Sequence, residues 1–162
     1  MPRFPAAALR EGIGHRVQGV RPAATPYTLQ PTPSIDARAS IFGRSVRIEV
    51  RLTIPEGWHV NSHRPLQDYL RPTELRLEPG VTYRLLRVEY PEGETVTLPF
   101  DPEPLSVYQG TVTLIAEVEA PPGLGAGSVT IPLLVSYQAC SDRECLPPAE
   151  ARVEVTASAT SA

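Results

Sequence analysis

The sequence has little of several features that would point to particular classes of protein. All fifteen basic residues are arginine, and eighteen acidic residues give a formal net charge of −3, so there is no basic excess for nucleic acid. No run approaches the roughly eighteen apolar residues of a membrane-spanning helix. The N-terminal stretch MPRFPAAALREGIGHRVQGVRP is positively charged but lacks the apolar core, about 7 to 15 residues long, of a secretory signal. We therefore expect neither nucleic-acid partners nor direct membrane insertion, and we find no visible export signal.

Proline, in contrast, is abundant, and its nineteen residues argue against a helical protein. Proline breaks the interior of helices and is tolerated at strand ends, edges and turns. A chain of 162 residues with 41% hydrophobic and 20% charged residues has room for one domain with a real core.

Alternation of apolar and polar residues then predicts short strands. In VRIEVRLTI (46–54) every second residue from Val46 to Ile54 is apolar, which is typical of a half-buried antiparallel strand. In TYRLLRVEY (82–90) the alternation changes phase at Leu85–Leu86, which indicates a β-bulge. Further strand-like segments lie at 73–78, 106–120, 129–137 and 151–156. About seven such strands separated by Gly/Pro turns predict an all-β fold, an immunoglobulin-like antiparallel β-sandwich.

The same patterns divide the chain. Residues 1–38 are rich in proline, show no sustained periodicity, and predict an extended or disordered N-terminal arm. Residues 39–157 form the β-sandwich domain, and residues 158–162 form a short C-terminal tail.

Both cysteines, Cys140 and Cys145, lie in SYQACSDRECLPPAE (136–150), between the last two predicted strands. A structural disulfide is one interpretation, although so small a ring contributes only about 2 kcal/mol in the chain-entropy model, against roughly 4 kcal/mol for a bridge across some sixty residues. A metal site is another, with nitrogen ligands from His59 and His63. Residues four apart on a strand are some 13 Å from each other, however, so we expect surface or loop histidines and no metal.

A reversible dithiol is the third interpretation. Disulfide exchange needs a thiolate, a second sulfur within bonding reach and access for a partner, and a tight turn between strands provides both proximity and exposure. Arg143 would favour a thiolate while Asp142 and Glu144 oppose it, and the prolines after Cys145 stiffen the exit of the loop. Spacing alone leaves the three interpretations open.

The segment YQACSDRECLPP resembles the active-site hairpin of the N-terminal periplasmic domain of the thiol:disulfide interchange protein DsbD. IPEGWHVNSHRP resembles an early strand and turn of the same family, and the resemblance covers roughly residues 40–157. It implies an immunoglobulin-like sandwich, without a cofactor, that exchanges disulfides with thioredoxin-like proteins outside the cytoplasm. By family analogy, its other partner would be a membrane electron-conducting thiol–disulfide transporter, and it would act in cytochrome c biogenesis. The insert between the cysteines is one residue shorter than in the best-known members.

The resemblance also implies roles for single residues. Cys145 would form the mixed disulfide with a partner and Cys140 would resolve it. Phe100, in LPFDPEPLSVY (98–108), would shield the cysteines from a mobile cap loop, and Tyr137 would pack beneath the pair. We therefore expect a protein-disulfide reductase or thiol–disulfide interchange component that acts through Cys140 and Cys145. The alternative is a non-enzymatic β-sandwich interaction module with a structural disulfide.

Overall fold

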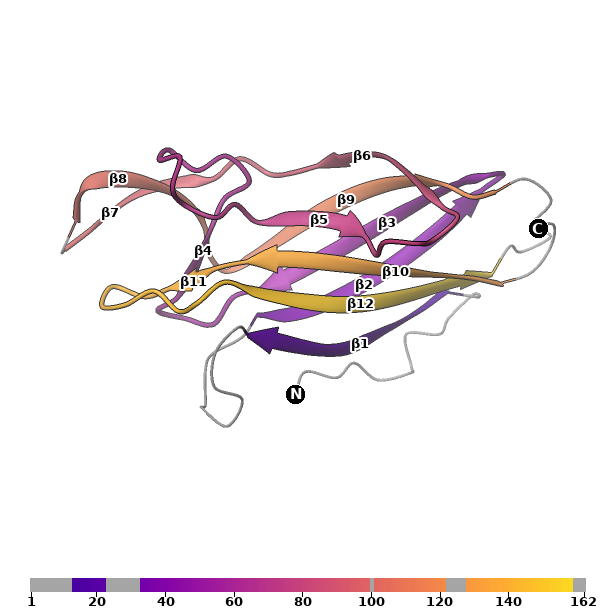
Figure 1. Cartoon of the computed structure of the whole chain (residues 1–162), viewed down its shortest axis with the longest axis horizontal. Helices are drawn as coiled ribbons and strands as arrows, with labels where there is room; N and C mark the ends of the chain where they lie inside the picture. Colours follow the sequence, from indigo (N-terminus) through magenta and orange to yellow (C-terminus); the bar gives the residue numbers. More distant parts are fainter. Residues whose placement is uncertain (1–12, 23–32, 100, 122–127, 159–162) are drawn as a thin grey trace.

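The computed structural model of the chain describes residues 13–22, 33–99, 101–121 and 128–158. Within these ranges there are twelve β-strands and no helix, and hence no helix that could cross a membrane (Figure 1). The strands are β1 (Ile13–Pro22), β2 (Ser34–Phe42), β3 (Ser45–Thr53), β4 (His59–Asn61), β5 (Glu74–Leu77), β6 (Arg84–Glu89), β7 (Glu94–Leu98), β8 (Asp101–Tyr108), β9 (Thr111–Glu119), β10 (Ser128–Tyr137), β11 (Ala139–Cys140) and β12 (Ala149–Ser158).

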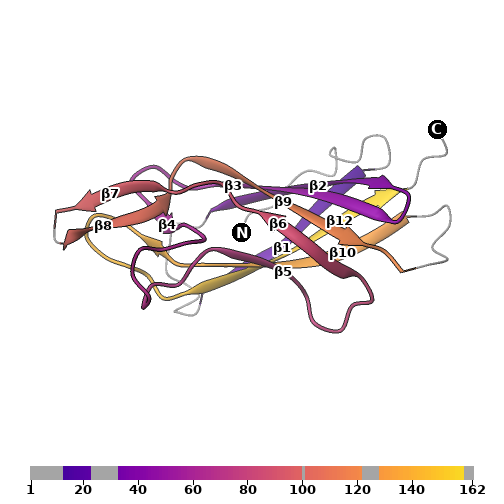
Figure 2. The same ribbon diagram turned by 90° about the horizontal axis from the view of Figure 1, so that it is seen from above.

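The strands pair in three antiparallel sheets of four. The strand order is β1-β12-β10-β5 in the first sheet, β2-β3-β9-β6 in the second and β11-β4-β8-β7 in the third. The first two sheets enclose the core, and the third lies at one end of the molecule (Figures 1 and 2). The predicted all-β, immunoglobulin-like antiparallel β-sandwich is confirmed.

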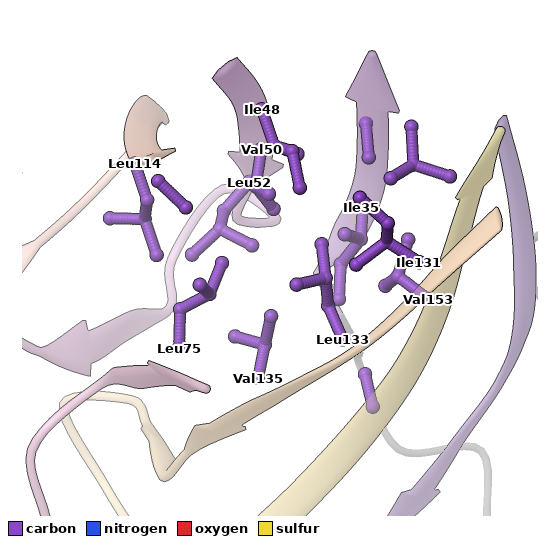
Figure 3. Close-up of a cluster of buried hydrophobic side chains, with 14 of the residues drawn as sticks. Ile35, Ile48, Val50, Leu52, Leu75, Leu114, Ile131, Leu133, Val135 and Val153 are labelled. Carbon is purple, nitrogen blue, oxygen red and sulfur yellow. The ribbon is translucent and has the colours of Figure 1, made fainter. Parts of the chain in front are cut away.

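The core forms because facing strands of the two main sheets alternate in phase. Figure 3 shows Ile48, Val50 and Leu52 of β3 on one side of the core, and Leu133 and Val135 of β10 on the other. All five side chains are at most 1% exposed. Burial of each side chain contributes about 1.5–3 kcal/mol to stability relative to exposure. This core therefore stabilises the sandwich that carries the cysteine hairpin.

Two segments differ from the sequence prediction. The segment 106–120, expected as one strand, contains the end of β8 and all of β9, because the chain turns at Gly110 and passes from the third sheet to the second. Gly110 has φ of 66°, a conformation that glycine adopts without the steric cost paid by other residues. The predicted bulge in β6 is confirmed, since the register with β9 shifts between Leu85 and Arg87.

Strands also occur within residues 1–38. β1 pairs with β12 along its length, and β2 begins at Ser34 and pairs with β3. β1 thus forms one edge of the first sheet, beside β12, and β2 forms one edge of the second.

Candidate functional site

The two cysteines close a short hairpin between β10 and β12. After Tyr137 the chain leaves the first sheet, and β11 pairs with β4 in the third. The Ser141 N–H donates to the Glu144 carbonyl at 2.8 Å, and the Leu146 N–H donates to the Ala139 carbonyl at 2.8 Å. The Ser141 hydroxyl oxygen also accepts the N–H groups of Arg143 and Glu144 at 3.1 and 3.2 Å. The backbone of the turn is therefore held by its own residues, independently of the sulfur atoms.

Cys140 and Cys145 are joined by a disulfide with an S–S distance of 2.10 Å and a Cα–Cα distance of 4.0 Å. The two residues differ sharply in exposure, since Cys140 is 3% exposed and Cys145 lies on the surface. A partner's sulfur can thus approach Cys145 far more readily than Cys140. This asymmetry is the feature of the site with the clearest chemical consequence.

The strand beside Cys140 brings a histidine to the pair. In the register of β11 with β4, Ala139 lies opposite Val60, and Cys140 lies opposite His59. Ala139 and Val60 belong to the main core, so Cys140 and His59 project from the other face of these strands. His59 is 4% exposed, and burial lowers the pKa of its imidazole.

The expectation of surface or loop histidines is wrong for His59, which is 4% exposed on β4, and holds for His63, which lies in the loop after β4. His63 stacks on Tyr90 with ring centroids 3.5 Å apart and an interplanar angle of 5°, and its Nδ1 lies 3.0 Å from the Thr73 carbonyl oxygen. Among the described residues, no group of three or more His, Cys, Asp or Glu side chains is arranged to hold a metal ion.

The region expected to cap the cysteines forms a β-hairpin. Residues 101–105, expected as part of the cap loop, belong to strand β8, which pairs with β7 and, at Val107 and Tyr108, with β4. Pro102 and Pro104 fit in this strand because β4 pairs only with its last two residues, so neither proline interrupts that ladder. The β7–β8 hairpin and the connection between β11 and β12 lie at the same end of the molecule (Figures 1 and 2). Phe100 lies outside the described residues.

Tyr137, the second predicted shielding residue, ends β10 and is 3% exposed within the main core. Its hydroxyl has no hydrogen-bond partner among the described residues, and burial raises its pKa far above the usual value. Tyr137 is therefore protonated at all physiological pH values and can act by packing or as a donor.

A buried tyrosine that the sequence analysis did not single out anchors this end of the sandwich. The Tyr108 hydroxyl donates to the Pro91 carbonyl at 2.8 Å and accepts the His63 N–H at 3.2 Å. It thereby ties β8 to the segment before β7 and to the residues that follow β4. Alternation places Tyr108 on a strand, but its bonds join residues 17 and 45 positions away, which no local pattern reveals.

One family model matches most of the chain. The model described as "Thiol:disulfide interchange protein DsbD, N-terminal" matches residues 28–157, a range that includes both cysteines and the strand beside them. No curated protein and no solved structure matches the chain.

Proposed function

The chain belongs to the family of N-terminal domains of the thiol:disulfide interchange protein DsbD, and we propose that it passes reducing equivalents through Cys140 and Cys145 to thioredoxin-like partners. The domains of this family are periplasmic, and we place the exchange outside the cytoplasm. The observation that carries the proposal is the unequal exposure of the two joined sulfur atoms.

The proposed exchange has two steps. In the reduced chain, the Cys145 thiolate attacks a sulfur of the partner's disulfide, forming a mixed disulfide and releasing the partner's other sulfur as a thiolate. Cys140 then loses its proton and attacks the Cys145 sulfur, which expels the partner's remaining sulfur. The partner gains two electrons and two protons and leaves as a dithiol, and the chain is left with the Cys140–Cys145 disulfide. A membrane electron-conducting transporter would restore the dithiol by the reverse exchange.

A redox titration tests this function against a structural disulfide. We expect the pair to titrate in a series of reduced and oxidised dithiothreitol or glutathione buffers, with a midpoint potential above about −300 mV. Exchange proteins have reduction potentials above this value, and structural disulfides typically have potentials below it. The fraction of free thiol, measured by alkylation and mass spectrometry, gives the midpoint. A far lower midpoint together with loss of folding on reduction would support the interaction module with a structural disulfide.

We also propose that Phe100 shields the pair. The support is that β7 and β8 flank Phe100 in the sequence and lie at the end of the molecule that carries the cysteines. We expect Phe100→Ala to raise the alkylation rate of the reduced cysteines several-fold and to leave the melting temperature nearly unchanged. Phe42→Ala serves as the control, because Phe42 is 66% exposed at the end of β2, in a different sheet. An unchanged alkylation rate with a collapsed melting temperature would make Phe100 a core residue.

A further inference from the structure

The enclosed position of Cys140 creates a problem of proton transfer. Only a thiolate attacks a disulfide, so the Cys140 thiol must lose its proton before it can resolve a mixed disulfide. Cys140 is 3% exposed, and burial disfavours the thiolate and limits the access of water to the thiol. An acceptor inside the protein would remove this obstacle.

His59 is placed to be that acceptor. It lies directly opposite Cys140 in the antiparallel register of β4 and β11 and on the same face. Residues opposite each other in such a pair have Cβ atoms about 4.5–5.5 Å apart, which an imidazole and a thiol can bridge. The Nε2 atom of His59 is buried and has no hydrogen-bond partner among the described residues. Buried polar atoms normally have a hydrogen-bond partner. Reduction of the disulfide would give Nε2 of His59 such a partner, the S–H group of Cys140.

The other polar groups near this face are engaged or unsuited. The Ser141 hydroxyl oxygen accepts two N–H groups of its own turn, and the Asn61 amide donates to the Arg71 carbonyl at 2.9 Å. Val107 of β8 lies opposite Asn61 on one side and opposite Glu94 of β7 on the other, so Glu94 is on the same face. Its carboxylate accepts a hydrogen bond from the Gln109 amide at 2.8 Å.

The remaining titratable groups near Cys140 do not suit the role of proton acceptor. Asp142, Arg143 and Glu144 are exposed on the turn. Tyr137 belongs to the main core, and its raised pKa prevents it from acting as a base. Burial lowers the pKa of His59, which keeps its imidazole neutral and able to accept a proton near neutral pH.

We propose that His59 accepts the thiol proton of Cys140 as Cys140 attacks the mixed disulfide at Cys145. The S–H bond of Cys140 breaks, its proton goes to Nε2 of His59, and its electron pair forms the bond to the Cys145 sulfur. The bond between Cys145 and the partner breaks, and the partner's sulfur leaves with that electron pair. In the reverse direction, the imidazolium returns the proton to Cys140 as it leaves. This role rests on the proposed exchange function and adds a residue to it.

Dithiobis-nitrobenzoate separates the two steps of exchange. The fully reduced chain reacts first to give a mixed disulfide and one nitrothiobenzoate, and closure of the Cys140–Cys145 disulfide then releases the second. We expect His59→Gln to slow the second release at least about ten- to thirtyfold near pH 7, because even an exposed thiol, with a reference pKa of about 8.5, is only a few per cent ionised there and burial lowers that fraction further. The defect should shrink steadily as the pH rises, because a growing fraction of the Cys140 thiol then ionises without help.

His63→Gln is the matched control, since His63 lies beyond the end of β4, is stacked on Tyr90 and has its Nδ1 3.0 Å from the Thr73 carbonyl oxygen. Its second release should match that of the unmodified chain at every pH. Equal second phases for His59→Gln and the unmodified chain would overturn the role of His59 and leave the exchange function standing. A defect of His59→Gln that has the same size at every pH would also overturn it, because a misplaced cysteine is not rescued by ionisation. If the unmodified chain never released a second nitrothiobenzoate, the exchange function itself would fail.

A second measurement needs no variant. The imidazole ¹⁵N resonances of His59 in the unmodified chain report its protonation and hydrogen bonding. We expect them to shift on reduction and, in the reduced chain, to titrate in step with the Cβ resonance of Cys140. His59 resonances that are identical in the oxidised and reduced forms would overturn the proposal.

Discussion

Replacing Cys140 with serine is expected to trap the chain in a stable covalent complex with a thioredoxin-like partner. The exposed Cys145 can still attack the partner's disulfide, but no thiol remains to resolve the mixed disulfide that results. Cys145→Ser should trap little or nothing, because the remaining thiol, at Cys140, is 3% exposed and is not accessible to the partner's disulfide. Non-reducing electrophoresis with purified thioredoxin-like proteins, followed by mass spectrometry of the adduct, measures the difference.

The two serine variants are each other's control, since both remove one sulfur from the same hairpin and both abolish the disulfide. Equal trapping by the two would remove the division of roles and leave exchange in place. An absence of adducts with a broad set of thioredoxin-like partners, for both variants, would return the pair to a structural disulfide. The double variant Cys140→Ser/Cys145→Ser shows that any adduct depends on these sulfur atoms.

The strands that the sequence predicted best are those with large apolar side chains in strict alternation. β3 is predicted almost residue by residue, because Val46, Ile48, Val50 and Leu52 point to the core while charged residues point away. β2 has the same alternation, but two of its buried positions are Ala37 and Ala39, which carry little hydrophobic signal. Strand β2 was therefore missed.

The features of the site that depend on residues close together in the sequence could be predicted. Those that depend on the pairing of distant strands could not. The proximity of Cys140 and Cys145 follows from their spacing, and the disulfide is present. The position of His59 beside Cys140 depends on the register of two strands about eighty residues apart, which no local pattern encodes. The unequal exposure of the cysteines likewise arises only when β11 leaves the first sheet to pair with β4.

The hydrogen bonds that hold the turn without the sulfur atoms lead to a last prediction, that stability and redox behaviour can be changed independently. Leu133→Ala should lower the free energy of unfolding by about 2–5 kcal/mol, because Leu133 is 0% exposed between the two main sheets and its truncation leaves a cavity. Reduction of the disulfide should cost no more than roughly 2 kcal/mol, the value for closing so small a ring, because hydrogen bonds of the turn remain. Denaturant unfolding of both redox forms measures the two costs.

Leu134→Ala is the matched control, since Leu134 is the next residue of β10, is half-buried and points away from the core, so its truncation should cost far less. The redox midpoint of Leu133→Ala should equal that of the unmodified chain, because the change destabilises the oxidised and reduced forms alike. A shifted midpoint would show that the core and the cysteine pair are coupled. Unfolding on reduction at moderate temperature would show that the disulfide holds the sandwich together, which is the property of a structural bridge and not of an exchanging one.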